Sequence, residues 1–154
     1  MTHIQYNITI QRPIDDVFTY ITSLERIAEW QRGVVRSELR SGGQLRSGAK
    51  VVEVRSFMGR EIEAPWEVTA YQPPHVRGFK ITEGPLQVDG AMRFVRDGSG
   101  TRVSFEAEMR GRGLFRLLET LIVAMIRRQT ARDFETAKRI LEPQMAPGTK
   151  KTSV

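Results

Sequence analysis

Side chains that could transfer protons are scattered along this chain, and no pair of them has a spacing typical of a catalytic site. Glu106 and Glu108 alternate with apolar residues, which places them on the solvent face of a strand. Glu53 and Arg55 share one face of a short strand whose inward side the pattern leaves open. Since neither two carboxylates nor a nucleophile and a base come together, the catalytic residues are unknown and enzymatic activity stays uncertain.

Other reactive groups are few. The chain has no cysteine, which excludes thiol catalysis, disulfides and cysteine-ligated metals. His3 and His75 are too far apart to form a local metal motif, so we expect no metal and no cofactor, and we expect His75 to be exposed beside a turn. Tyr71 and Glu63 would turn inward only if Pro65 introduces a bulge into their strand.

More side chains are suited to contact with a buried apolar ligand than to proton transfer. The side chains expected to face inward and to bind such a ligand are Trp66, Val68, Met92, Phe94, Phe105, Ala107 and Met109 from strands and Leu118, Leu121 and Met125 from a helix. Methionine is suited to adaptable apolar sites. An ordinary filled core would show the same pattern, so the pattern alone does not separate a core from a cavity.

The elements that carry these residues follow from the periodicity. Residues 3–11 alternate as a half-buried strand, Pro13 begins a helix, and a second short helix runs from 23 to Trp30. From Gly33 onward the period is mostly two, which predicts an antiparallel sheet with one dry face. The predicted strands are 34–39, 51–57, 61–71, 76–81, 86–95 and 102–109.

Residues 114–142 contain no glycine or proline and are predicted to form one long helix. One apolar stripe should pack on the sheet along the whole helix: Phe115, Ile122, Ile126, Thr130, Phe134, Ala137, Ile140 and Leu141. A second stripe exists only in the first half: Leu114, Leu117, Leu118, Leu121 and Met125. This second stripe either lines a cavity or forms an exposed patch for a homodimer or a membrane surface.

Arginines follow the second stripe on the same side of the helix. Arg128, Arg132 and Arg139 would contact an anionic headgroup at a cavity mouth or lipid phosphates, or would simply be solvated. The whole net charge of +6 lies in residues 110–154, whereas residues 1–109 are balanced. No helix-turn-helix, zinc finger or phosphate-binding loop accompanies the charge, so we do not expect nucleic acid as a partner.

The length of 154 residues favours a single domain, here 1–142, followed after Pro143 by a flexible basic tail at 143–154. No apolar run approaches the roughly 18 residues of a membrane-spanning helix. The first ten residues do not have the pattern of a secretory signal. We therefore expect the protein to be cytoplasmic.

Three segments carry a resemblance to a known family. Residues 12–34 contain Pro13, the pair Val17-Phe18 and then Trp30. Residues 66–85 combine a strand, a proline-rich turn and a second strand. Residues 98–109 form a hairpin arm. In this order they resemble the START-like (SRPBCC) superfamily of polyketide cyclase/dehydrase and birch-pollen-allergen-like proteins. The resemblance covers 3–142.

The resemblance implies an α+β helix-grip fold, in which a curved antiparallel sheet of about seven strands wraps a long C-terminal helix and two short helices follow the first strand. It also implies a cavity for a hydrophobic small molecule such as a lipid or polyketide. Three functions stay open: binding of that molecule, a cyclase or dehydrase reaction in the same cavity, and a lipid-binding role in contact with a membrane or partner.

Overall fold

The computed structural model describes residues 1–142. The chain opens with β1 (Thr2–Ile10), α1 (Ile14–Thr22) and α2 (Ile27–Trp30). Pro13 precedes α1 with a φ of −56°, the angle that its ring imposes and that a helix accepts. Asp15 and Asp16 lie in the first turn, where carboxylates are favoured by the helix dipole. The two short helices after the first strand are therefore confirmed.

Seven strands form one antiparallel sheet in the order β1-β7-β6-β5-β4-β3-β2. The strands after β1 are β2 (Val34–Leu39), β3 (Lys50–Phe57), β4 (Arg60–Gln72), β5 (Val76–Ile81), β6 (Leu86–Asp97) and β7 (Gly100–Gly111). Each strand from β2 to β6 pairs with the next strand along the chain, whereas β1 pairs with β7, with Ile4 opposite Ala107. The first two strands therefore lie at opposite edges of the sheet, and α1 and α2 connect them across one face.

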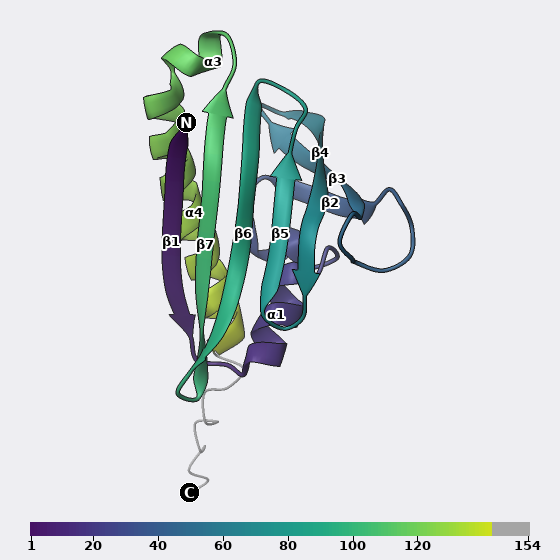
Figure 1. Cartoon of the computed structure of the whole chain (residues 1–154), viewed down its shortest axis with the longest axis vertical. Helices are drawn as coiled ribbons and strands as arrows, with labels where there is room; N and C mark the ends of the chain where they lie inside the picture. The colour runs from purple at the N-terminus through teal and green to yellow at the C-terminus, as the bar shows by residue number, and fades with distance from the viewer. Residues whose placement is uncertain (143–154) are drawn as a thin grey trace, which may run out of the picture.

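The C-terminal helical region is divided into α3 (Leu114–Leu117) and α4 (Glu119–Leu141), so the prediction of one uninterrupted helix is wrong. Leu118 leaves helical geometry, with φ −96° and ψ 4°. The break changes the direction of the chain. The helix α3 packs on the end of β7, whereas α4 runs back over the sheet against β1 and α2 (Figure 1). The curved sheet gripping a long helix is the predicted helix-grip fold.

The core fills the space between α1, α2, α4 and the inner face of the sheet. Phe94 is fully buried and meets Phe18 edge-on, with 5.0 Å between ring centroids. The predicted inner stripe of α4 is buried at Phe134, Ala137 and Leu141. Phe115 does not follow the prediction, because it belongs to α3 and is 40% exposed.

The strand β4 contains an irregularity at a different place from the one expected. Pro65 is paired regularly with β3, and the register shift occurs between Val68 and Ala70 in the pairing with β5. The extra residue, Thr69, reverses the alternation, so Val68 and Tyr71 both contribute to the core. Proline has no backbone NH to donate. At Pro65 no hydrogen bond to β5 is lost, because β5 pairs with β4 only from residue 67 onward.

No helix within residues 1–142 combines the length and the apolar composition needed to cross a membrane. The tail predicted at 143–154 lies outside the described residues.

Candidate functional site

A cavity of about 230 Å³ lies between the inner face of the sheet and α4. Side chains from α2, α4 and the five strands β3 to β7 surround it. They are Trp30, Gln31, Arg55, Trp66, Arg77, Phe79, Ile81, Met92, Phe105, Ile126, Gln129, Thr130, Asp133 and Phe134. Pockets for drug-sized ligands usually measure roughly 300–1,000 Å³, so this cavity suits a compact molecule.

Aromatic rings form most of the apolar wall. The Phe79 and Phe105 rings stack with 5.8 Å between centroids, and Phe105 lies 5.9 Å from Phe134 on α4. Trp30, at the end of α2, lies on the other side of Phe134, with 5.4 Å between the two ring centroids. Rings from β5, β7, α2 and α4 therefore meet around one space.

Gly90 on β6 makes room for part of this wall. It is paired directly with Phe79. A Cβ atom at position 90 would lie 2.7 Å from Cζ of Phe79 and 2.6 Å from the backbone oxygen of Glu106, both too close for a stable contact. The absence of a side chain on Gly90 therefore allows the Phe79 ring to lie flat beside β6.

The cavity also has one deeply buried cation. Arg77 is only 4% exposed, and its Cζ lies 5.1 Å from the ring centroid of Trp66, a cation–π arrangement. Burial lowers the pKa of Arg77 to about 10, and the nearby Glu53 charge opposes that shift. Nε and Nη1 of Arg77 have no hydrogen-bond partner among the described residues. At neutral pH the cavity wall therefore carries a protonated guanidinium with two unsatisfied donors.

A polar network fixes the aromatic partner of Arg77. The indole NH of Trp66 donates to Oε2 of Glu53 at 3.0 Å. The other carboxylate oxygen forms a 2.6 Å ion pair with Arg55, which also donates to Gln31 at 3.2 Å. Glu53 is 5% exposed, so the face that the sequence left open, with Glu53 and Arg55, is the inner one.

A carboxyl group on α4 faces the same cavity. Oδ1 of Asp133 accepts hydrogen bonds from Nε2 of Gln129 at 2.6 Å and from the backbone NH of Arg32 at 3.1 Å. Burial raises the pKa of Asp133, and these hydrogen bonds partly offset the shift. Within residues 1–142, no three histidine or carboxylate side chains converge as a metal site would require.

The structure places the predicted strand residues in two groups. Three of them line the cavity: Trp66, Met92 and Phe105. The others are buried in the core away from it: Val68, Phe94, Ala107 and Met109.

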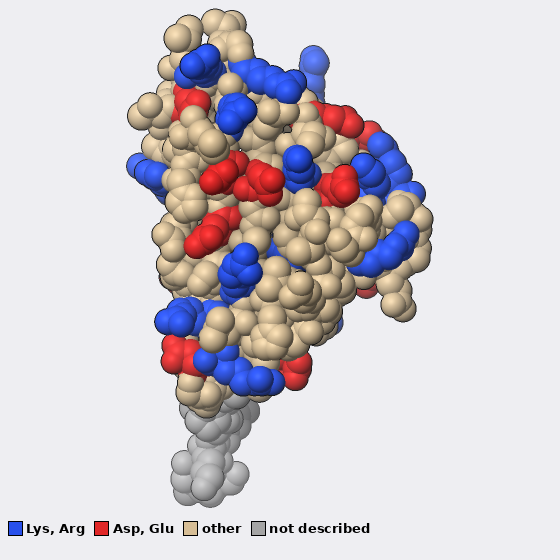
Figure 2. Space-filling model, in the orientation of Figure 1, with Lys and Arg blue, Asp and Glu red and all other residues tan. Residues whose placement is uncertain are grey.

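The predicted helix residues lie elsewhere. Leu118, Leu121 and Met125 do not line the cavity but are exposed, and Arg128 and Arg132 are exposed as well. The second stripe points outward because α4 turns its opposite face to the sheet. Figure 2 shows the tan surface at the end of the molecule where α3 lies, with Lys and Arg side chains directly beneath it.

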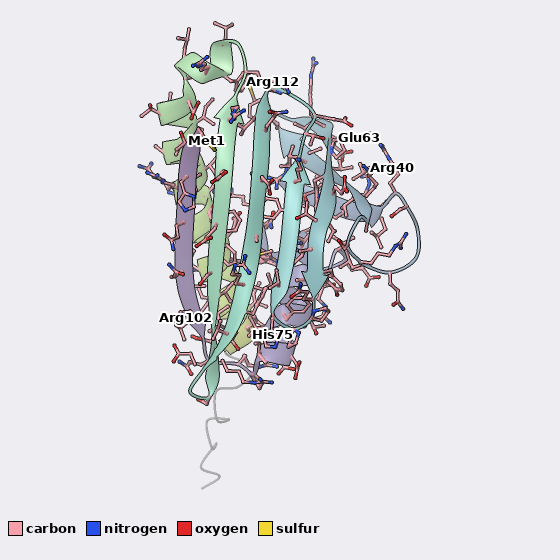
Figure 3. The ribbon with its side chains drawn as sticks, in the orientation of Figure 1. Met1, Arg40, Glu63, His75, Arg102 and Arg112 are labelled. Atoms are coloured by element: carbon pink, nitrogen blue, oxygen red, sulfur yellow. The ribbon has the colours of Figure 1, made fainter. Side chains whose placement is uncertain are left out.

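Two of the scattered reactive groups can be followed in Figure 3. Glu63 points away from the cavity and pairs with Arg40 at 3.7 Å, so the expectation that Glu63 could turn inward is wrong. The reason is that the bulge follows Glu63 rather than preceding it. His75 is exposed beside its turn, as expected.

Arg77 and Asp133 line the cavity but were not predicted from the sequence. The sequence of β5 did contain an indication for Arg77. It lies two residues before Phe79 and four before Ile81, so all three share one face of the strand, whereas Lys80 lies on the other face. For Asp133 the neighbouring Phe134 belongs to the inner stripe, which places the carboxyl at the edge of that stripe.

Comparison with known proteins agrees with this architecture. The model of the family described as "Polyketide cyclase / dehydrase and lipid transport" matches residues 1–142. No curated protein sequence matches the chain closely enough to count as a relative.

Solved structures show the same fold at low identity. TTHA0849 from Thermus thermophilus is 16% identical with a TM-score of 0.76, and the alignment covers 93% of this chain and 99% of that one. Ara h 8.0201 is 12% identical with a TM-score of 0.73, covering 91% and 97%. The di-domain ARO/CYC StfQ from the steffimycin biosynthetic pathway is 16% identical with a TM-score of 0.72, covering 92% of this chain and 45% of StfQ.

Proposed function

The chain belongs to the polyketide cyclase/dehydrase and lipid transport family, and from this membership we propose that it binds a compact hydrophobic small molecule in the cavity between the sheet and α4. The aromatic wall would bury the apolar part of the ligand, which contributes roughly 25 cal/mol for each Å² removed from water before the costs of association. The volume of about 230 Å³ limits that ligand to a small molecule or a short acyl chain.

The observation that carries the finer proposal is the buried Arg77. Two of its guanidinium donors lack partners, and unsatisfied buried donors are costly. A ligand oxygen that accepts from these donors would remove that cost, and a carboxylate or enolate would add charge attraction. We therefore expect an amphipathic ligand with an apolar body and an anionic or strongly accepting oxygen at one end.

Tryptophan fluorescence offers a direct test, because the two tryptophans of the chain, Trp30 and Trp66, both line the cavity. Octanoate and 1-octanol serve as probes with the same tail and different heads. In the wild-type protein, the emission change should show octanoate binding at least tenfold more tightly than octanol. In Arg77→Met this preference should vanish while octanol still binds.

Arg93→Met is the matched control, because Arg93 is an exposed arginine on the neighbouring strand β6. It should retain the preference for octanoate. If neither probe binds, the proposed cavity function is wrong. If both bind equally to the wild type, the assignment of a head-group role to Arg77 is wrong.

A second candidate function is acid–base chemistry on the bound molecule, favoured by Asp133, whose carboxyl lines the cavity and has a raised pKa. The test is exchange of the acidic CH protons of a small apolar 1,3-diketone in D₂O, followed by NMR. Catalysis predicts faster exchange with the wild-type protein than with Asp133→Asn. Equal rates with both proteins would exclude this role for Asp133.

A further inference from the structure

A contiguous apolar surface lies outside the cavity, on α3 and the first two turns of α4. We call it the α3–α4 patch, and its members are Leu114, Phe115, Leu117, Leu118, Leu121 and Met125. Leu114 is 76% exposed, Leu117 is 81% exposed and Leu121 is 61% exposed. Contiguous exposure of large apolar side chains is uncommon on a soluble domain and marks an interaction surface.

The fold itself cannot cover this patch. On α4, Val123 is buried against the sheet and Ile126 lines the cavity. At 100° per residue, Leu121 and Met125 project from the opposite side of the helix. The patch therefore faces outward as a consequence of how α4 is packed.

Positive charge surrounds the patch without matching negative charge. Residues 110–132 contain six arginines and one acid, Glu119. The Glu119 carboxylate accepts a hydrogen bond from the Thr2 hydroxyl and lies 4.0 Å from the N-terminal ammonium. One carboxylate against six arginines leaves this segment with a clear excess of positive charge.

The arginines lie close to the patch on both sides. Arg112 precedes α3 and Arg116 lies within it, and Figure 3 shows Arg112 at this end of the molecule. Arg128 comes two turns after Leu121 on the same side of α4, about 10 Å along the axis at 1.5 Å per residue. Arg128 therefore borders the patch on its α4 side, while Arg112 and Arg116 lie at its α3 side.

We propose that the α3–α4 patch docks on the surface of an anionic lipid membrane. The leucines would enter the boundary between headgroups and acyl chains, and the arginines would pair with lipid phosphates. The cytoplasmic leaflet is anionic, so the cytoplasmic location predicted from the sequence would bring the patch to such a surface. A second copy of the chain is a poorer occupant, because a two-fold axis through the patch would bring two sets of arginines together.

This proposal does not depend on ligand binding in the cavity, and its test uses no cavity ligand. The full chain is sedimented with phosphatidylcholine vesicles and with vesicles containing 30% phosphatidylglycerol. We expect binding only to the anionic vesicles and weakening at high salt, where the Debye length shortens. Arg116→Gln with Arg128→Gln should weaken partitioning about 30-fold, since each arginine near the surface contributes about 1 kcal/mol.

Leu117→Gln with Leu121→Gln should weaken partitioning at least tenfold without unfolding, since both side chains are exposed. Phe57→Gln with Ile62→Gln is the apolar control, because both are exposed on the β3–β4 hairpin. Arg93→Gln with Arg102→Gln is the charge control, with Arg102 near the opposite end of the molecule (Figure 3). Neither control should change binding.

Binding that is equal for both vesicle types, or that survives the leucine substitutions, would overturn the proposal. A second result would also overturn it: a concentration-dependent dimer in sedimentation velocity that the leucine substitutions abolish, with no binding of anionic vesicles by the wild type or by the leucine variant. That second result would assign the patch to a homodimer.

Discussion

The guanidinium group of Arg77 lies over the indole ring of Trp66, with Cζ 5.1 Å from the ring centroid, and the indole NH is held by Glu53 at 3.0 Å. A buried cation is thus placed against an aromatic face whose position depends on a buried carboxylate. Removing the cation and removing the carboxylate should have different effects on stability, because Glu53 bonds to Trp66 and Arg55, whereas two donors of Arg77 have no hydrogen-bond partner.

Replacement of Arg77 by methionine tests the cost of the buried charge. We expect the free energy of urea unfolding of Arg77→Met to be within about 1 kcal/mol of wild type or higher, because the substitution removes a buried charge with two unsatisfied donors and therefore also removes their desolvation cost. Glu53 is not left alone, since Arg55 remains paired with it at 2.6 Å. A loss above about 3 kcal/mol would show that Arg77 supports the fold instead of the ligand.

Replacement of Glu53 by leucine should have the opposite effect. It leaves the Trp66 indole NH without an acceptor and removes the countercharge for Arg55 and Arg77. We expect a loss of about 3–5 kcal/mol in urea unfolding. Glu53→Gln should lose less, because an amide oxygen still accepts from the indole.

Glu61→Gln is the surface control for Glu53, because Glu61 forms an exposed pair with Arg36 at 3.6 Å. Exposed pairs contribute about 0–1 kcal/mol, so this variant should stay close to wild type. Similar losses for the two glutamine variants would contradict a special role for the buried carboxylate.

A side chain at position 90 should disturb both stability and the cavity. Gly90→Ala places a methyl group against the Phe79 ring and the Glu106 carbonyl, and overpacking of this kind costs about 1–3 kcal/mol. Thermal unfolding gives the loss, and tryptophan emission reports the change in the cavity. Gly84→Ala measures backbone strain alone, since Gly84 has a φ of 91° and open space around it. An unchanged melting temperature for Gly90→Ala would show that Phe79 moves without cost.

The raised pKa of Asp133 predicts a pH dependence. The folded state binds the Asp133 proton more tightly than the unfolded chain does, and this tighter binding stabilises the fold. The stabilisation is complete below the ordinary pKa of 3.8 and is lost as the pH rises through the raised pKa. Asp133→Asn should therefore gain stability relative to wild type as the pH rises above the ordinary pKa of 3.8. Melting temperatures across this range provide the measurement, with the exposed Asp89→Asn as control, and parallel curves for Asp133→Asn and wild type would refute the effect.

The sequence was sufficient to predict most of the architecture. A period of mostly two identified the strands, and residues 98–109 were recognised as one arm of a hairpin, which is the hairpin between β6 and β7. The break at Leu118 was not predictable, because leucine is a strong helix former and the break follows from the packing of α3 on the end of β7. The bulge at Thr69 was missed for a related reason. The register is set by the pairing of two strands, so the sequence of β4 alone does not reveal it.

The site was predicted less completely than the fold. Apolar alternation identified Trp66, Met92 and Phe105 correctly as inward residues, but it could not separate the cavity wall from the core positions of Val68 and Phe94. That distinction depends on where side chains fail to fill the space between layers. The outward direction of Leu121 was equally hidden, because an apolar stripe is the same in sequence whether it meets a sheet or solvent.

The strand order has a consequence for folding kinetics. The strands β2 to β7 are consecutive hairpin neighbours and close short loops, whereas the pairing of Ile4 with Ala107 joins segments about a hundred residues apart. The helix α4 packs on β1, so the first and last described elements lie together at one edge of the sheet. We expect the meander β2 to β7 to organise first and β1 and α4 to dock last. Substitutions in β1 and α4 should then mainly accelerate unfolding and have little effect on the folding rate.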